Sequence, residues 1–386
     1  MLSTTQPGRR RAAGASALLA LSLVTGCGSA TGTPAVGGSE GAGAAADSKG
    51  LAQAEADYKA ALNVANLELP MPTDAIDPGH KKVAIISIGQ NSTSGVYETR
   101  FLEQAAKDIG WTPTVFDGQL DVGKIANYIE QASQSDFDAI VYEGLDAALL
   151  KTSIEGALKS GKLVGGFNVV NTVLQDQIIL ASDDFTNEGR MAAVAMVANS
   201  GGKAKIKMYY DKQYALVVNR VEGASAYIQE MCPACTIDKE TVSSADLAQP
   251  GPPYFSAFLS TNPKGKFTDV LGYSDGAAQA YAKTAAAAGR MDLSITTFDA
   301  LPAAIAELKN KDYNVSAVTT NNWEYHAYAM MDLLARQMQG KPLWKGADST
   351  KVGLVDKSTA DAYPTDGTSP NSAKYVAQFK KLWGKP

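Results

Sequence analysis

Polar side chains follow a series of short apolar segments, and hydrogen bonding is the chemistry that these residue types offer. Residues 83–88 are apolar except for Ser87, for example, and Gln90 and Asn91 come directly after them. Amide and carboxyl groups placed at the carboxyl ends of buried strands are positioned to hold a small polar solute. The side chains that stand in such positions are Gln90, Asn91, Glu143, Asn168, Asp275, Asp299 and Asn322.

Residue types that enzymes commonly use for proton transfer and metal binding are scarce. The chain has two histidines, His80 and His326, which lie far apart in the sequence. It contains no phosphate-binding loop of the Gly-x-x-x-x-Gly-Lys-Ser/Thr type. With two histidines, acid–base catalysis would fall to carboxylates such as Asp275 and Asp299. Helix capping or ligand binding also explains why carboxylates stand at these positions. The sequence predicts a protein that is not an enzyme and that has no metal or cofactor.

The motif Cys232-Pro233-Ala234-Cys235 has three interpretations. A redox pair and half of a zinc site both use this spacing, and a structural disulfide is the third. No second cysteine pair is available to complete a zinc site. The secretory leader described next implies an oxidising compartment, which favours the disulfide, with a redox role as the lesser alternative.

The amino terminus has the features of a secretory signal. Arg9, Arg10 and Arg11 precede an apolar run over 12–24, which is too short to span a membrane and ends in Val-Thr-Gly-Cys. These four residues resemble the bacterial lipobox, which implies that residues 1–26 are removed and that Cys27 is lipidated; a plain signal peptide is the alternative. We then expect 27–80 to form a flexible tether with a short helix over 51–62.

Composition limits the class of the mature protein. The 386 residues are 45% hydrophobic and 19% charged, with a net charge of −5, and they suffice for two domains. Basic clusters interleaved with aromatic residues are absent from the sequence, which excludes a nucleic-acid partner. We expect an extracytoplasmic protein that is anchored by lipid to the bacterial cell membrane.

Apolar strands alternate with helices from residue 82 onwards. The pattern restarts after a helix over 188–198, so that two similar halves result. Strands and helices of this length form parallel βαβ units with helices on both faces of the sheet. The sequence therefore predicts an α/β protein with two doubly wound, Rossmann-like, parallel-sheet domains, whose polar strand ends face an interdomain cleft. The expected strands cover 83–88, 112–116, 139–142, 163–167 and 178–182, then 206–210, 236–242, 270–273, 295–298 and 315–319.

Several motifs occur in a characteristic order along these halves. They are Phe-Asp-Ala-Ile-Val at 137–141, Ala-Ser-Asp-Asp at 181–184, Arg-Val-Glu-Gly at 220–223, Asp-Gly-Ala-Ala at 275–278 and Phe-Asp at 298–299. With them the chain resembles type I periplasmic binding proteins of the ribose/galactose-type sugar-binding family. The resemblance implies a monomeric substrate-binding lipoprotein that closes about a hinge on a sugar, polyol or sugar derivative. It also implies an ABC permease and its ATPase as partners.

The resemblance also assigns lobes and further ligand-binding residues. It implies an N-terminal lobe of 81–184 plus 322–346 and a C-terminal lobe of 185–321 plus 347–386. Arg220 matches the basic ligand residue of the family; a cation at a helix start needs ligand oxygens or a carboxylate as its partner. Tyr210 and Trp323 are candidates for the stacking face of the ligand site.

The sequence departs from the family pattern at two places. Asn168 stands where the family often has Asp, and Ser94-Gly95 replaces an aromatic pair. Hydroxyls at 92–94 predict a helix cap, with an anion site as the alternative. A sensory or signal-binding lipoprotein of the same fold is the alternative function, and a secreted carbohydrate-active enzyme is a third.

Overall fold

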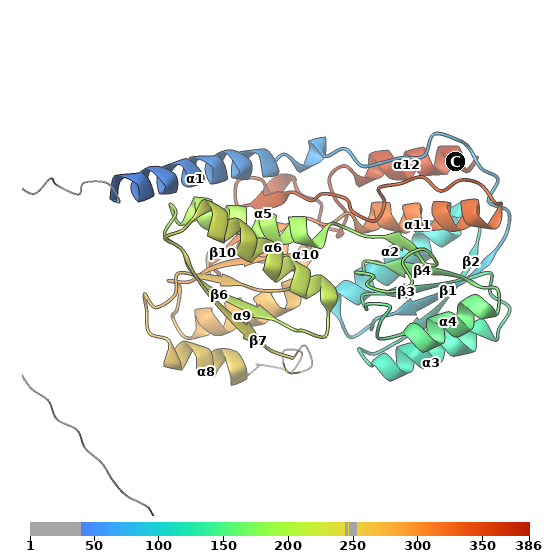
Figure 1. The fold of residues 1–386 in the computed structure, drawn as a ribbon, viewed down its shortest axis with the longest axis horizontal. Helices are drawn as coiled ribbons and strands as arrows, with labels where there is room; N and C mark the ends of the chain where they lie inside the picture. Colours follow the sequence, from blue (N-terminus) through green and yellow to red (C-terminus); the bar gives the residue numbers. More distant parts are fainter. Residues whose placement is uncertain (1–39, 244–245, 247–252) are drawn as a thin grey trace, which may run out of the picture.

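The computed structural model of the protein describes residues 40–243, 246 and 253–386, with the side chains described from residue 48 onwards. The expected signal segment 1–26, the lipidation residue Cys27 and the first part of the expected tether lie outside these residues. Among the described residues, no helix is long and apolar enough to cross a membrane. Two α/β units and a long amino-terminal helix make up the molecule (Figure 1).

The first sheet has five parallel strands in the order β2-β1-β3-β4-β5. Alternate residues of its central strand β1 enter two different cores, since Ile85 packs with Phe101 while Ile86 packs with Ile125. A continuously apolar strand is therefore buried on both faces, as expected for a parallel sheet. The elements are β1 Lys82–Ser87, α2 Thr93–Ile109, β2 Thr112–Asp117, α3 Val122–Ser133, β3 Ala139–Glu143, α4 Lys151–Lys159, β4 Leu163–Phe167 and β5 Ile179–Ala181.

The second sheet has six strands in the order β11-β10-β9-β8-β6-β7, of which β11 alone is antiparallel to its neighbour. The predicted pair of doubly wound α/β domains is thus confirmed, and the antiparallel edge strand is an addition that the sequence did not predict. The elements are α5 Phe185–Asn199, β6 Lys205–Tyr210, α6 Ala215–Met231, β7 Thr236–Thr241, α8 Pro253–Thr261, β8 Asp269–Leu271, α9 Asp275–Ala287, β9 Ser294–Thr297, α10 Pro302–Lys309, β10 Val315–Thr319 and β11 Leu354–Asp356.

Two helices that follow the second sheet in sequence pack with the first. Helix α11 (Trp323–Met338) contacts α2, β4 and β5, and α12 (Ser372–Leu382) packs on α11. Phe379 and Trp383 share one apolar cluster with Ile85. We call the first sheet with α2–α4, α11 and α12 the first lobe, and the second sheet with its other helices the second lobe. We therefore propose that the tail around α12 belongs to the first lobe, whereas the sequence placed all of 347–386 in the second.

Helix α1 (Glu40–Ala61) contains nearly all of the helix that was expected over 51–62. It begins earlier, in the stretch 40–50 where a flexible tether was expected, and that part of the expectation is wrong. Residues 40–49 are rich in alanine, the residue with the highest helix propensity, which accounts for the longer helix. The helix lies along α5 and α6 of the second lobe (Figure 1). Asp57 accepts hydrogen bonds from Arg190 at 2.6 Å and from Tyr227 at 3.2 Å, and Ala54 is fully buried.

Close contact between α5 and α6 fixes the second turn of α6, where Arg220 lies. A side-chain carbon on Gly189 would lie 1.8 Å from the backbone oxygen of Arg220, and one on Gly223 would lie 2.2 Å from that of Thr186. Glycine is required at both positions because the two helix backbones approach directly. This contact places Glu188 of α5 beside Arg220 of α6.

Candidate functional site

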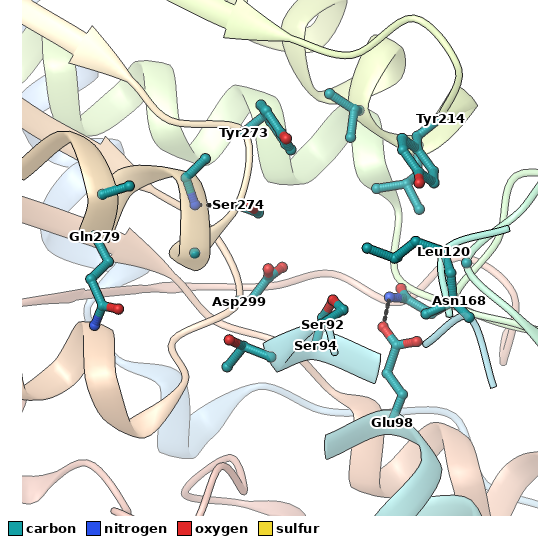
Figure 2. Close-up of a pocket in the computed structure, with 18 of the residues that line it drawn as sticks. Ser92, Ser94, Glu98, Leu120, Asn168, Tyr214, Tyr273, Ser274, Gln279 and Asp299 are labelled. Carbon is teal, nitrogen blue, oxygen red and sulfur yellow. Dashed lines mark hydrogen bonds between the residues drawn. The ribbon is translucent and has the colours of Figure 1, made fainter. Parts of the chain in front are cut away.

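A cavity of about 480 Å³ lies between the lobes, at the carboxyl ends of the strands of both sheets (Figure 2). Its volume is in the range of small-molecule sites, and such sites favour the strand ends of α/β sheets. Both lobes contribute polar side chains to its wall. Residues that line it include Asn91, Ser92, Ser94, Glu98, Leu120 and Asn168 from the first lobe, and Tyr214, Arg220, Tyr273, Ser274, Gln279 and Asp299 from the second.

Three residues of the cavity wall other than glycine adopt left-handed backbone conformations. The φ angles are 60° at Leu120, 52° at Asn168 and 80° at Asp299. Side chains other than glycine adopt this region at some cost in energy, and such residues concentrate at ligand sites. Backbone contacts hold two of them: the Asn168 N–H donates to Ala181 at 3.0 Å, and the Asn321 amide donates to the Asp299 carbonyl.

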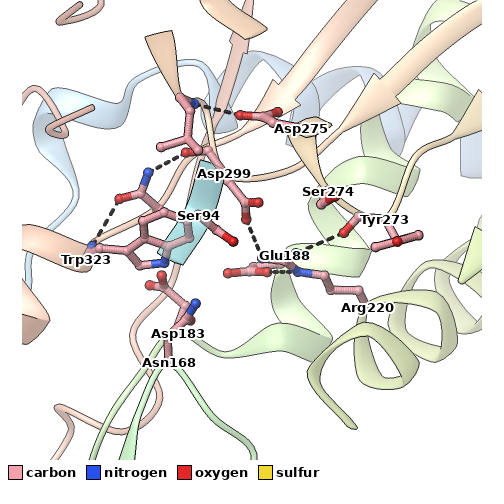
Figure 3. Close-up of polar contacts among 12 residues, drawn as sticks. Ser94, Asn168, Asp183, Glu188, Arg220, Tyr273, Ser274, Asp275, Asp299 and Trp323 are labelled. Carbon is pink, nitrogen blue, oxygen red and sulfur yellow. Dashed lines mark hydrogen bonds and ion pairs between the residues drawn. The ribbon is translucent and has the colours of Figure 1, made fainter. Parts of the chain in front are cut away.

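Arg220 is buried and its guanidinium is held from three directions (Figure 3). Its Nε donates to the Glu188 carboxylate, Nη2 donates to Asp299 at 2.6 Å, and Nη1 donates to the Tyr273 carbonyl at 3.1 Å. The Phe298 ring lies 4.5 Å from the guanidinium carbon. Arg220 lies in the second turn of α6, not at the helix start that the sequence predicted, and its charged partners are two carboxylates of the protein.

Glu98 and Asn168 form a buried pair on the first-lobe side of the cavity. The Asn168 amide donates to Glu98 Oε1 at 2.5 Å. Glu98 Oε2, Asn168 Oδ1 and the indole N–H of Trp323 are buried and have no hydrogen-bond partner among the residues that the structure describes. The sequence analysis missed Glu98; its spacing of four residues from Ser94, which places both on one helix face, is the signal that indicates it.

The ten sequence-predicted site residues divide into two sets. Asn91, Asn168, Arg220, Asp299 and Trp323 line the cavity together. The other five lie outside its wall and four of them bond to other parts of the protein. Gln90 donates to Ser87 and Thr99, Glu143 accepts from Ile88 and Thr99, Asp275 accepts from Leu301, Asn322 donates to Asp183, and Tyr210 ends β6.

Cys232 and Cys235 form a disulfide in the turn between α6 and β7. The bridge closes a very short loop, so its contribution to the chain entropy of unfolding is small. Among the residues that the structure describes, no cluster of His, Cys, Asp and Glu side chains could hold a metal ion.

Glu143 gives the protein a pH-dependent stability. Burial raises the pKa of its carboxyl to about 8, although the Thr99 hydroxyl and the Ile88 N–H oppose the shift. As pH rises, the unfolded chain loses this proton first, near its ordinary pKa of 4.5, so the folded state binds more protons between there and about 8. The free energy of unfolding therefore falls through this window. We expect Glu143→Gln, which mimics the protonated carboxyl, to lose less thermal stability than the wild type over the same pH range.

Thermal denaturation at a series of pH values measures this difference. Glu103→Gln is the matched control because it neutralises a carboxylate of α2 that is partly exposed and pairs with Lys107. It should follow the wild-type profile. Parallel profiles for the wild type and Glu143→Gln would show that Glu143 titrates normally.

Comparison with known proteins agrees with this architecture. A family model described as periplasmic binding protein domain matches residues 85–342, whereas no curated protein matches the chain. Three solved structures illustrate the similarity in fold. An ABC transporter solute-binding protein from Agrobacterium vitis with bound allitol is 16% identical, with a TM-score of 0.65 over 73% of this chain and 97% of its own. A sugar ABC transporter protein from Yersinia enterocolitica is 15% identical, with a TM-score of 0.69 over 81% and 99%.

The third is an ABC transporter solute-binding protein from Mycobacterium smegmatis with bound glycerol. It is 19% identical, with a TM-score of 0.67 over 75% of this chain and 99% of its own. At such identities the similarity establishes the fold. That fold is the type I periplasmic binding fold, as the sequence motifs predicted.

Proposed function

Since the chain belongs to the family of periplasmic binding protein domains, we propose that it is the solute-binding component of an ABC importer. It captures a small polyhydroxylated ligand, such as a sugar, a polyol or a derivative of either, between its two lobes. The single observation that carries the proposal is the polar cavity at the strand ends, which both lobes line. A ligand that bonds to both walls binds the closed arrangement better than an open one, and this difference in affinity drives hinge closure.

The wall of the cavity suits a ligand with several hydroxyl groups. Asn91, Asn168 and Asp299 offer hydrogen-bond acceptors, and the Trp323 indole N–H and the Asn91 amide offer donors. Tyr214 and Trp323 also line the cavity and supply aromatic surface. They would take the role of the aromatic pair that the family has and this chain lacks. Two of the similar proteins contain bound allitol and bound glycerol, which are both polyols.

We further propose that the protein acts as a monomer outside the cytoplasm, anchored to the cell membrane by lipid on Cys27. The lipobox-like sequence Val-Thr-Gly-Cys supports the anchor. The permease and ATPase of an importer would receive the ligand from the closed form. A Cys27→Ser variant that still fractionates with membranes would contradict the anchor.

A thermal-shift screen of the purified protein tests the ligand class. A ligand at about one hundred times its dissociation constant adds about 2.7 kcal/mol to the free energy of unfolding. For lobes of this size we expect a rise in melting temperature of roughly 5–11 °C. The panel contains neutral sugars, polyols, amino sugars and sugar acids, with amino acids as the unrelated class. If no sugar or polyol of any kind raises the melting temperature, the proposal fails.

A further inference from the structure

The first-lobe wall of the cavity presents two adjacent buried oxygen atoms that lack hydrogen-bond partners among the described residues. Glu98 is 2% exposed and Asn168 is 4% exposed, and the hydrogen bond between them uses Glu98 Oε1 and the Asn168 amide nitrogen. Glu98 Oε2 and Asn168 Oδ1 remain without a partner among the described residues, and both side chains line the cavity. Buried polar atoms in native proteins are almost always hydrogen-bonded, so an occupant of the cavity is expected to supply the missing partners.

The charges at the buried wall favour a cationic occupant. Glu98 and Asp299 both line the cavity, and Figure 2 shows them on different sides of it. The buried cation of the wall is Arg220, which already bonds to two carboxylates, those of Glu188 and Asp299. Lys283 also lines the cavity, but its side chain is exposed at the rim. Two carboxyl groups therefore bond to the one buried guanidinium, and Glu98 is a third buried carboxyl group, with no ion pair among the described residues.

An anionic ligand fits the same wall poorly. The hydroxyls at the start of α2 were the candidate anion site, and those of Ser92 and Ser94 bond to each other at 2.9 Å. Glu98 lies one turn further along this helix, and its carboxylate form would repel an anion bound at the helix start.

We propose that this wall binds the ammonium group of an amino sugar or amino polyol, with Glu98 Oε2 and Asn168 Oδ1 accepting its N–H groups. The inference rests on the proposed function and narrows its substrate class. An ammonium group has three N–H donors and no acceptor, which matches two adjacent acceptors better than a hydroxyl does. The hydroxyl groups of the same ligand would face Asn91, Asp299 and Trp323 across the cavity.

Binding of such a ligand should release a proton. Burial and the nearby Glu143 carboxyl raise the pKa of Glu98 above its ordinary value, while the Asn168 amide lowers it. The charged groups that face Glu98 from other elements are Glu143, Asp299 and Arg220. An ammonium group beside Glu98 would favour the carboxylate, so the carboxyl would lose its proton on binding. A neutral sugar would leave the proton in place.

Matched ligand pairs test the proposal by isothermal titration calorimetry. Glucosamine is compared with glucose, galactosamine with galactose, and glucamine with glucitol, and N-acetylglucosamine retains the nitrogen without its charge. We expect at least one amine to bind about tenfold or more tightly than its neutral partner, as a charge-assisted hydrogen bond predicts. Titrations in buffers of different ionisation enthalpy should detect the released proton for the amine alone.

Glu98→Gln separates a ligand contact from a structural role. The variant keeps the size of the side chain and its bond to Asn168 but removes its charge. We expect it to lower the affinity for the amine about tenfold more than the affinity for the neutral partner, and to abolish proton release. Glu103→Gln, on the surface of the same helix, is the control and should change none of these values.

The outcomes distinguish this inference from the proposed function. If neutral sugars or polyols bind while no amine binds more tightly, or if Glu98→Gln leaves amine affinity unchanged, the inference is wrong and the proposed function stands. If neither neutral nor amino ligands bind, both are wrong. Tight binding of an amine that is lost in Glu98→Gln supports both.

Discussion

Replacing Arg220 by alanine is expected to lower the free energy of unfolding by about 3–5 kcal/mol, because it leaves two carboxyl groups buried without their cation. Glu188 and Asp299 both bond to this guanidinium, and all three side chains are almost completely buried. Coulomb attraction within the cluster offsets the cost of removing the charges from water. For a protein of this size we expect the melting temperature to fall by roughly 6–20 °C.

Differential scanning calorimetry measures the change, and two variants control for it. Lys212→Ala removes an exposed cation close in sequence and should leave the melting temperature within about 1 °C, as for most surface substitutions. The triple variant Arg220→Met, Glu188→Gln, Asp299→Asn removes the cation and both charges together. It should regain part of the lost stability, since buried neutral amides cost less than buried carboxylates that lack their cation. A triple variant as unstable as Arg220→Ala would refute the unpaired-charge explanation.

This stability effect changes how binding data on Arg220 should be interpreted. The residue lines the cavity, so loss of ligand binding on its replacement would agree with a direct contact. The same loss would follow from a displaced Asp299, because Arg220 holds that carboxylate. Substitutions that keep the fold, such as Glu98→Gln, therefore test ligand contacts more directly.

Sequence patterns predicted the two sheets well because the signal for a parallel strand is local. Runs such as 83–88 and 163–167 are apolar enough to require cover on both faces, and each coincides closely with a strand. Strand β11 has three residues, and its pairing with β10 depends on a distant part of the chain. The packing of α1 on α5 and of α12 on α11 cannot be predicted from the apolar periodicity of these helices. An amphipathic pattern shows which face of a helix is buried but does not identify the helix that covers it.

Strand ends were also predicted better than the directions of the side chains that follow them. Gln90 and Asn91 are neighbours after β1, yet Asn91 lines the cavity while Gln90 bonds to Ser87. Asp275 starts α9 and turns away to cap the backbone of Leu301. Which way such a side chain turns depends on partners from other segments, and a single sequence carries no signal for them.

Asn322, a sequence-predicted ligand residue, instead joins the segments that connect the lobes. Its amide and its backbone N–H both donate to the Asp183 carboxyl, at 2.6 and 3.2 Å. The Thr350 hydroxyl donates to the same carboxyl at 2.7 Å. Asp183 follows β5, Asn322 follows β10 and Thr350 precedes β11, so one buried carboxyl ties together three interlobe connections. We propose that this arrangement makes Asp183 the centre of the hinge between the lobes.

Asp183→Ala is therefore expected to destabilise the protein and loosen the hinge. The Asn322 N–H and the Thr350 hydroxyl lose their buried acceptor, and an unpaired buried donor costs about 1–3 kcal/mol, so the total loss is about 2–6 kcal/mol. The melting temperature should fall, and small-angle X-ray scattering of the ligand-free protein should show a larger radius of gyration as the lobes separate more widely.

The neighbouring carboxylate provides a matched control for this hinge. Asp184 caps α5 by accepting from the Asn187 N–H at 3.0 Å, and it lies outside the three-segment cluster. Asp184→Ala should cost only about 1 kcal/mol, the usual value for a helix cap, with an unchanged radius of gyration. If Asp183→Ala behaved like Asp184→Ala in both measurements, the Asp183 carboxyl would not hold the three interlobe connections together. Interlobe geometry would then depend on the backbone contacts between Ser182 and Ala347 and between Asp184 and Thr350, which both variants keep.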